Sequence, residues 1–451
     1  MRQSFMIALG LFFAAVPSFA DEPPKLEPVS SRLSGRLQHS DPSKDATDSI
    51  VEIHFSPDGK RLMAGDYPGG IINVWDVGSG KRLATMETGL GFRAGSDYFA
   101  VSPDWKTIYS PTRERGFNGE KIEVGGNQLM SWSFNDAVQV FDIESGKLSG
   151  SWQHSPPREI RTLTLSPNGA YFLTSDGVPG IYQRDYKRTM SVWNAKTGTS
   201  QTLDDRYGRS AMFSPDSKRI ALVTKSTENE DFDRTVTIVD APNLQPKTVI
   251  FLPPGNVVAS PCAFCSGSSV CVVSTTVLEK ADQWHPSADA LRFYDVKTGT
   301  ELFQAPAAEK DEGFYRVTVA PDGQTVAAAS SKPKGGMARL LLVTAGSWQS
   351  KRLELGENKL VGSMAFHPSG KWLAVSTFEF PKQGGPPPTT LPQPRIQIVD
   401  VATGKIAETL IMPQCYPESV AFSPDGKTLA TSGTGEVLLW DFSTPPGEKQ
   451  P

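Results

Sequence analysis

The sequence lacks the motifs that identify most metal-, haem- and nucleotide-dependent enzymes. Only four cysteines are present, and the Cys-x-x-Cys pair of Cys262 and Cys265 is followed by Ser266, where covalent haem attachment needs histidine. No second cysteine pair exists and no two histidines stand at metal-ligand spacing, so a zinc site is not indicated. A Gly-x-Ser-x-Gly elbow and a phosphate-binding glycine loop with lysine are also missing. These absences predict no cofactor and no bound metal.

An excess of positive charge is missing as well, and so are long apolar runs outside the N-terminus. Arg2, the apolar residues 5–16 and the tripeptide Ser18-Phe19-Ala20 predict a secretory signal peptide over residues 1–20, with an uncleaved membrane anchor as the alternative. No other segment approaches the roughly 20 apolar residues of a transmembrane helix. Without Arg2, 44 Lys and Arg residues stand against 49 Asp and Glu residues, a net charge of −5, which argues against broad nucleic-acid binding. We therefore expect a periplasmic or extracellular protein that binds no nucleic acid.

A turn-forming phrase is what the chain has in abundance. Phe-Ser-Pro-Asp-Gly-Lys at residues 55–60 follows a stretch in which Val51, Ile53 and Phe55 alternate with polar residues, as in a β-strand. Proline fixes φ at the second turn position, serine and aspartate bond the local backbone, and glycine accepts a positive φ. The phrase returns around Pro103, Pro167, Pro215, Pro321, Pro368 and Pro424, and a degenerate copy stands at residues 264–267.

Each copy of the phrase belongs to a unit of four predicted strands. In the first unit these are residues 50–55, 62–65, 71–75 and 82–86. The third strands of the later units end at Phe141-Asp142, Trp193-Asn194, Val239-Asp240, Tyr294-Asp295, Val343-Thr344, Val399-Asp400 and Trp440-Asp441. A unit of this length that recurs along the chain predicts an array of small antiparallel sheets.

These strings resemble the WD-repeat family of β-propellers, in a divergent form with Ser-Pro-Asp-Gly turns. The resemblance covers residues 34–442 and implies an all-β fold, a single β-propeller of four-stranded blades. WD repeats often carry a Gly-His dipeptide whose histidine joins a hydrogen-bonded network with a tryptophan. This chain has no such dipeptide, and its five histidines (39, 54, 154, 285 and 367) are not expected to supply that network. No partner specificity is carried over from the family.

The repeats also predict how the ring closes. Eight units predict eight blades, and seven blades with a decayed fifth unit is the alternative. The last unit ends after its third strand, at Trp440-Asp441-Phe442. Residues 33–39 resemble the fourth strand of unit two, so we expect them to complete the last blade and to cover its free edge. The predicted plan is signal peptide 1–20, linker 21–33, propeller 34–442 and proline-rich tail 443–451.

Additional length is inserted mostly between the second and third strands. The insertions are residues 111–136, 176–189, 226–234, 276–289 and 379–395. In an antiparallel blade they emerge opposite the Ser-Pro-Asp-Gly turns, and insertions on one face of a repeat protein often mark its binding side. Aromatic and arginine side chains are enriched at binding hot spots, although such residues could instead only fasten the loops to the disc. The candidate contact residues are Arg113, Arg115, Trp132, Tyr182, Arg184, Tyr186, Arg188, Trp284, His285, Phe378 and Phe380.

The cysteines of the fifth unit suggest a disulfide, because an oxidising compartment favours one. The predicted hairpin register sets Phe264 opposite Cys271, which places Cys262 and Cys271 on the same side as near neighbours. A bond between them, or between Cys265 and Cys271, would replace the missing Pro-Asp of this turn. Small buried residues are the alternative, and Cys415 is expected to stay free.

The sequence thus favours an exported, non-enzymatic scaffold that binds a protein or glycan through its loop-rich face. A hydrolase or oxidoreductase with active-site residues gathered from several blades in the central channel is the alternative. The channel lining separates the two possibilities. Clustered Asp, Glu, His and Arg with perturbed pKa values would favour the enzyme, and small apolar residues would favour the scaffold.

Overall fold

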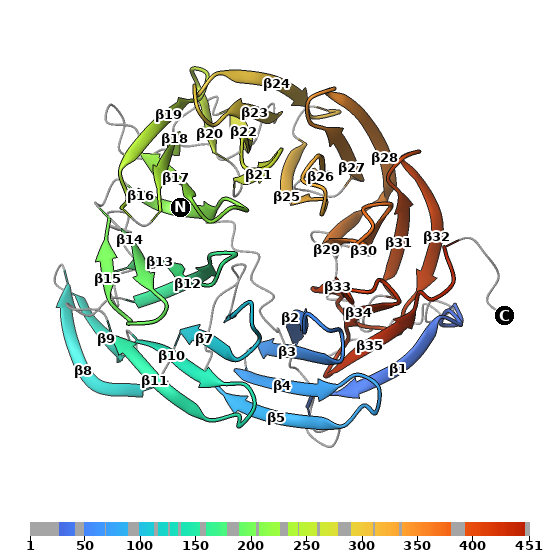
Figure 1. Cartoon of the computed structure of the whole chain (residues 1–451), viewed down its shortest axis with the longest axis horizontal. Coiled ribbons are helices and arrows are strands. Elements are labelled where there is room, and N and C mark those ends of the chain that lie inside the picture. Colours follow the sequence, from blue (N-terminus) through green and yellow to red (C-terminus); the bar gives the residue numbers. More distant parts are fainter. Residues whose placement is uncertain are drawn as a thin grey trace.

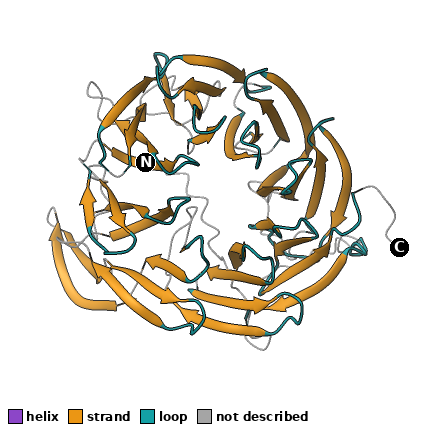
Figure 2. Cartoon of the chain, viewed as in Figure 1, coloured by secondary structure: helices purple, strands orange, loops and turns teal. Residues whose placement is uncertain are grey.

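The structure, a computed structural model, consists of β-strands arranged as eight blades around a common centre (Figure 1; Figure 2). In each blade the strands form an antiparallel meander, with the first strand nearest the centre and the fourth at the rim. The predicted eight-bladed, all-β propeller is confirmed, and the seven-bladed alternative is wrong. The structure describes residues 27–40, 49–67, 69–88, 99–111, 116–124, 127–133, 137–153, 159–177, 189–203, 207–225, 233–241, 243–258, 262–277, 290–309, 312–332, 336–379 and 393–446.

The first four blades use the strands β2 to β19. Blade 1 contains β2 (Ser49–Phe55), β3 (Arg61–Tyr67), β4 (Ile71–Asp76) and β5 (Arg82–Glu87). Blade 2 contains β6 (Ala100–Val101), β7 (Thr107–Pro111), β10 (Ala137–Asp142) and β11 (Leu148–Gln153), and a separate hairpin of β8 (Gly116–Val124) and β9 (Asn127–Ser133) is inserted in it. Blade 3 contains β12 (Glu159–Leu165), β13 (Tyr171–Gly177), β14 (Thr189–Asn194) and β15 (Ser200–Thr202). Blade 4 contains β16 (Tyr207–Phe213), β17 (Arg219–Lys225), β18 (Asp233–Asp240) and β19 (Pro246–Phe251).

The other four blades follow in the same order. In blade 5 the inner strand is in two parts, β20 (Asn256–Val258) and β21 (Ala263–Cys265), and both pair with β22 (Val270–Val277), which β23 (Ala290–Asp295) and β24 (Glu301–Pro306) follow. Blade 6 contains β25 (Gly313–Val319), β26 (Thr325–Ser331), β27 (Met337–Thr344) and β28 (Gln349–Glu357). Blade 7 contains β29 (Lys359–Phe366), β30 (Trp372–Glu379), β31 (Arg395–Asp400) and β32 (Lys405–Ile411). Blade 8 contains β33 (Val420–Phe422), β34 (Thr428–Ser432), β35 (Glu436–Asp441) and, from the other end of the chain, β1 (Leu33–Gln38).

A buried serine holds the turn between the first two strands of a blade. The hydroxyl of Ser56 donates to Asp58 Oδ1 (2.6 Å) and accepts from the N–H of Arg61 (2.9 Å). Because this hydroxyl donates to the Asp58 carboxylate, the pKa of Asp58 lies below its ordinary value. The same serine bond recurs in four other blades, at Ser102 with Asp104, Ser166 with Asn168, Ser214 with Asp216 and Ser423 with Asp425.

Where such a turn has a glycine, at residues 59, 169 and 426, that glycine lies close to the turn of the preceding blade. Gly169 has a φ of 70°, and a Cβ atom there would lie 2.6 Å from Pro103. Gly426 has a φ of 73°, and a Cβ atom there would overlap the His367 ring. A side chain at either position would strain the backbone and collide with the neighbouring blade. The turns therefore follow one another closely around one end of the ring, which we call the turn face.

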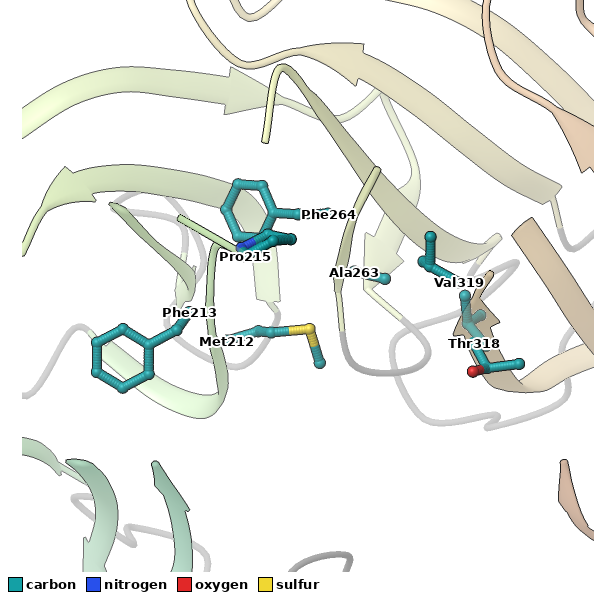
Figure 3. Close-up of a pocket in the computed structure, with 8 residues that line it drawn as sticks. Met212, Phe213, Pro215, Ala263, Phe264, Thr318 and Val319 are labelled. Carbon is teal, nitrogen blue, oxygen red and sulfur yellow. The ribbon is translucent and has the colours of Figure 1, made fainter. Parts of the chain in front are cut away.

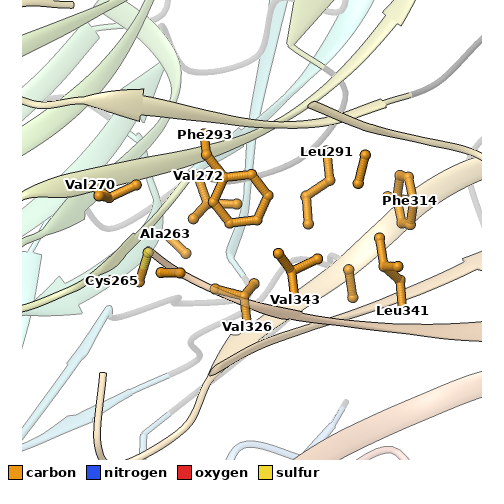
Figure 4. Packing of buried hydrophobic residues seen from close by; sticks show 13 residues of the cluster. Ala263, Cys265, Val270, Val272, Leu291, Phe293, Phe314, Val326, Leu341 and Val343 are labelled. Carbon is orange, nitrogen blue, oxygen red and sulfur yellow. The ribbon is translucent and has the colours of Figure 1, made fainter. Parts of the chain in front are cut away.

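The hydrophobic core lies between neighbouring blades. Figure 4 shows the cluster between blades 5 and 6, where buried side chains such as Val272 and Phe293 face buried side chains such as Val326 and Val343. Removing one such side chain from water contributes roughly 1.5–3 kcal/mol to folding. Each blade thus depends on both neighbours to cover its two faces.

The strand β1 closes the ring as predicted. It pairs antiparallel with β35, with Leu33 opposite Trp440 and Leu37 opposite Val437. Arg32, which is 2% exposed, fastens this join: its guanidinium donates to Glu408 Oε1 (2.6 Å) and to the carbonyl oxygens of residues 441, 444 and 445 (2.9–3.1 Å). One buried side chain from the start of the propeller therefore holds the last strand and the segment after it.

His39 corrects one expectation from the sequence. It follows β1, where the chain passes from blade 8 to blade 1, and its Nε2 lies 3.2 Å from Asp66 Oδ2 with both side chains fully buried. Its ring lies 5.8 Å from the ring of Trp75, and Asn73 Nδ2 lies 3.3 Å from its Nδ1. The expectation that no histidine supplies an internal network is wrong for His39. The position after the closing strand brings this histidine to Asp66, Asn73 and Trp75 although no glycine precedes it.

The turn of blade 5 has an unusual backbone conformation. Phe264 pairs with Cys271, as predicted. Three successive residues of the turn, Ser266, Gly267 and Ser268, have φ values of 50°, 61° and 75°, and such values are uncommon for serine. The turn is held from both sides, because Ser268 Oγ accepts from the N–H of Asp216 (3.3 Å) and the N–H of Ser266 donates to the carbonyl of Gly323 (2.6 Å).

The cysteines of blade 5 divide between its two faces. Cys262 and Cys271 share the cluster between blades 4 and 5, and their thiols are hydrogen-bonded; this bond and burial raise the pKa of Cys271. Cys265 belongs to the cluster between blades 5 and 6, and burial raises the pKa of its thiol to about 11. All four cysteines are free thiols in this structure. A disulfide therefore stays a prediction, and the geometry favours Cys262 with Cys271 over Cys265 with Cys271.

Arg32→Ala should weaken the closure of the ring. The change removes the buried guanidinium from its contacts with Glu408 and with three carbonyl groups, and removal of one partner of a buried ion pair typically costs about 3–5 kcal/mol in the free energy of unfolding. Arg36→Ala on the same strand is the matched control, because the Arg36 side chain is 49% exposed and exposed ion pairs contribute about 0–1 kcal/mol. Urea unfolding of both variants checks this, and equal losses would contradict the role given to Arg32.

The turn aspartates should make stability depend on acid pH. Hydrogen bonds from serine lower the pKa of Asp58, Asp104 and Asp425 in the folded state. Their contribution is therefore present above the unfolded pKa of about 4 and is lost as pH falls through the lower folded values. The triple Asp→Asn variant should fold, since Asn168 occupies this place in blade 3. Its melting temperature should fall less than that of the wild type below about pH 4, and parallel melting curves would count against this account.

Export should convert Cys262 and Cys271 to a disulfide, given their contact. Protein isolated from an oxidising compartment without reductant, then alkylated after denaturation, should show two modified cysteines in its mass spectrum, Cys265 and Cys415. Cys262→Ala should show three, because it releases Cys271, whereas Cys265→Ala should show one. Four modified cysteines in the wild type would rule the disulfide out.

Candidate binding face

The two ends of the ring carry different connections. Because the strands of a blade alternate in direction, the second-to-third connections and the connections between blades emerge opposite the turn face, at an end that we call the loop face. Five blades have long second-to-third connections, between residues 111 and 137, 177 and 189, 225 and 233, 277 and 290, and 379 and 395. In blades 1, 6 and 8 this connection is short. The short connections therefore belong to blades 6, 8 and 1, and the long ones to blades 2 to 5 and to blade 7.

Most of the candidate contact residues lie outside the described residues. These are Arg113, Arg115, Tyr182, Arg184, Tyr186, Arg188, Trp284, His285 and Phe380. For Trp132 the structure gives the backbone only, in β9 opposite Phe117. Phe378 is the candidate whose side chain is described. The roles of all these residues stay predictions.

Phe378 packs against a connection between blades. It lies in β30, and its ring meets the ring of Tyr416 edge to face, with centroids 5.8 Å apart and planes at 89°. Such aromatic pairs add about 0.5–1.5 kcal/mol beyond their buried area. This contact fits the alternative in which loop-face aromatics fasten loops, although Phe378 also keeps part of its surface exposed.

The connection from β32 to β33 lies directly on the inner strand of blade 7. Ser376 Oγ donates to the carbonyl of Pro417 (2.9 Å), and a Cβ atom at Gly362 would overlap that same carbonyl oxygen. Gly362 sits in a β-bulge of β29, between Val361 and Ser363. Bulges redirect side chains and are frequent near functional sites. Glycine at this place lets the segment approach closely, and the segment then presents Glu418.

A second bulge, in blade 6, interrupts the inner strand β25 next to Arg316. The bulge lies between Phe314 and Arg316 in β25. Tyr315 Oη accepts from the N–H of Val361 (2.8 Å), and Arg316 Nε donates to the carbonyl of the same residue (3.3 Å). Blade 6 thus binds both polar backbone groups of Val361 in blade 7. The Nη nitrogens of Arg316 make no hydrogen bond or ion pair with any residue that the structure describes.

Arg316 and Glu418 influence each other electrostatically without touching. Arg316 is exposed to solvent, yet the surrounding protein lowers its pKa by desolvation. Burial raises the pKa of Glu418, and the Arg316 charge partly opposes that rise. No direct ion pair joins the two groups among the described residues, so each keeps polar atoms for another partner.

Sequence reasoning missed this group because its members are far apart along the chain. Arg316, Gly362 and Glu418 come from three blades, and only the closed ring brings them together. Gly362 was the one available signal, since a glycine inside a strand pattern suggests a bulge or a close backbone approach.

Blade 6 contains a further charged cluster, but its members satisfy one another. Glu312, which is 1% exposed, accepts from Ser330 Oγ (2.5 Å) and from Arg339 Nη1 (3.0 Å). Arg339 also contacts Glu309, which pairs with Lys332 (2.5 Å). A cluster with its charges paired in this way stabilises the connection before β25 and offers little to a ligand.

An apolar hollow of about 270 Å³ lies near the turn face, at the inner strands of blades 4, 5 and 6 (Figure 3). Its lining residues are Met212, Phe213, Pro215, Ala263, Phe264, Val317, Thr318 and Val319. Thr318 supplies the only side-chain hydroxyl among them. The lining of this hollow is thus apolar, whereas the exposed Arg316 lies on the inner strand β25 nearer the loop face, a mixture that fits neither the enzyme nor the scaffold pattern alone.

Within the described ranges, no three His, Cys, Asp or Glu side chains are grouped so as to hold a metal ion. No helix there is long and apolar enough to cross a membrane.

Comparison with known proteins supports the fold. The family "WD domain, G-beta repeat" matches residues 414–441, which make up most of blade 8, and no curated protein matches the chain. The C-terminal WD40 domain of Sif2 superposes with a TM-score of 0.60 at 9% identity, over 93% of this chain and 100% of that one. The Dos1 propeller gives 0.58 at 14% identity, over 92% and 96%. The repeat match in blade 8 and these two likenesses together support a WD-repeat β-propeller as the fold of this chain.

Proposed function

We propose that this chain is an exported scaffold that binds a protein partner through its loop face. The WD40 propeller fold generally serves as a protein-interaction scaffold. Export is inferred from the signal-peptide pattern of residues 1–20 alone. A periplasmic or extracellular location is part of the same proposal.

The observation that carries the proposal is the one-sided placement of the long connections. All five emerge at the loop face, whereas the turn face repeats short turns of one type. Loops positioned by a rigid scaffold are where proteins place most of their binding residues. The arginine- and aromatic-rich segments from Arg113 to Trp132 and from Tyr182 to Arg188 belong to these connections.

Binding explains the central charges better than catalysis does. An enzyme that works through a covalent intermediate needs a nucleophile beside an activating base. Arg316 and Glu418 make no side-chain hydrogen bond to a serine, threonine or cysteine side chain in the described part of the chain. We therefore propose a binding role for this pair of charges, and no enzymatic role.

Affinity capture with the tagged chain from the native envelope fraction tests the proposal. A captured protein that rebinds the purified chain would be the partner. The variant Arg184→Ala/Tyr186→Ala/Arg188→Ala should weaken that binding at least roughly tenfold, as expected when hot-spot side chains are truncated. The turn-face variant Lys60→Ala/Lys106→Ala/Lys218→Ala is the matched control and should bind like the wild type, since these lysines are exposed on the other side. Equal binding by all three proteins would count against the loop face.

A further inference from the structure

We infer that Arg316, at the loop-face side of the central channel, binds a carboxylate group of a ligand. Arg316 lies on the inner strand β25, which is followed around the ring by the inner strands β29 and β33 of the next two blades (Figure 1). Its side chain is exposed to solvent there, and its Nη nitrogens have no partner among the described residues. A guanidinium with this edge free can bind a carboxylate through two parallel hydrogen bonds.

The guanidinium is oriented before any ligand arrives. Its Nε is already engaged with the carbonyl of Val361 (3.3 Å), and the neighbouring Tyr315 is fixed by the N–H of the same residue (2.8 Å). Arginine side chains otherwise lose considerable rotamer entropy on binding. An orientation fixed in the free protein removes part of that cost, so the opposite edge of the fork is prepared for a planar anion.

Three successive blades build the site. Blade 6 contributes Arg316, and blade 7 contributes the bulge at Gly362 on which the next connection rests. Blade 8 is reached through that connection, which places Glu418 within electrostatic range of Arg316. Tyr416, on the same connection as Glu418, packs against Phe378 of β30.

Glu418 selects among anions by its charge. It lies close enough to affect Arg316 but does not form a direct ion pair with it in the described structure. A phosphate group carries about −1.5 to −2 charges near neutral pH, so the Glu418 carboxylate repels it more strongly than it repels a carboxylate with one charge. One guanidinium beside one carboxylate therefore suits a ligand group with a single negative charge. If the proposed scaffold function holds, that carboxylate belongs to the partner, as an acidic side chain or a chain terminus.

Titration of the full-length protein, labelled with ¹⁵N-arginine, tests the inference directly. The Nε–Hε signal of Arg316 is assigned from its loss in Arg316→Gln. N-acetylaspartic acid α-amide represents an acidic side chain, N-acetylalanine represents a chain terminus, and inorganic phosphate is the competing anion, all at constant ionic strength. We expect a saturable shift of the Arg316 signal with at least one of the two carboxylates, at lower concentration than with phosphate. The carboxylate that binds tighter identifies the source, and the exposed Arg36 reports non-specific effects.

Two variants sharpen the result. Glu418→Gln should tighten phosphate binding roughly tenfold and carboxylate binding less, because the repulsion it removes scales with the ligand's charge. Arg316→Lys keeps the charge but loses the fork and the Nε contact with Val361. Isothermal titration calorimetry, which does not need the Arg316 signal, should show weaker carboxylate binding by this variant than by the wild type. The inference is overturned if the Arg316 signal shows no saturable shift, if it shifts no more than that of Arg36, or if phosphate binds the wild type tighter than both carboxylates.

This outcome is separable from that of the proposed function. A carboxylate-dependent shift without any captured partner would support the site and count against the scaffold. A captured partner that binds Arg316→Gln as tightly as the wild type, with no carboxylate shift, would support the scaffold and overturn the site.

Discussion

One buried hydroxyl group in each of five blades, 1 to 4 and 8, sets the turn geometry on which the ring depends. The turn serine donates to the aspartate two residues later and accepts the N–H five residues later, so a single side chain fixes the whole turn. The turn then serves as a spacer between blades. In blades 3 to 6 the contacts continue from turn to turn, as from the N–H of Asn168 to Ser217 Oγ (3.0 Å). A small change at one turn would alter the spacing of the blades, and the core between blades is packed too closely to absorb it.

This constraint divides the molecule into a fixed end and a variable end. At the turn face, glycines that approach the neighbouring blade leave no room for added side chains. At the loop face, the second-to-third connections vary in length from a few residues to the insertion that contains the hairpin β8–β9. The same sheets therefore support connections of very different length without a change in their packing. Arg316 lies on an inner strand and Glu418 on a connection between blades, and both side chains keep part of their surface exposed.

Much of the fold could be predicted from the sequence because its determinants are local. Alternation around Ile53, the turn after Phe55 and the resemblance of residues 33–39 to a fourth strand each depend on neighbouring residues. The blade count, the closing strand and the register at Phe264 followed and are correct. The group around Arg316 could not be predicted, because it depends on two bulges and on the contact of three blades. The contact of His39 with Asp66, 27 residues further along the chain, could not be predicted for a related reason, because it forms only where the ring closes.

The Arg32 closure has a consequence for the order of folding. The strand β1 is synthesised first, yet its partner β35 is separated from it by about 400 residues, as the bond from Ser34 to Leu439 shows. Such a contact has a very high sequence separation, and it forms late because the intervening chain must be ordered first. Until the last blade has been made, the edge of β1 remains unpaired and open to wrong partners. A chain cut short before Glu436 therefore cannot hide this edge, and the closing strand distinguishes complete chains from truncated ones.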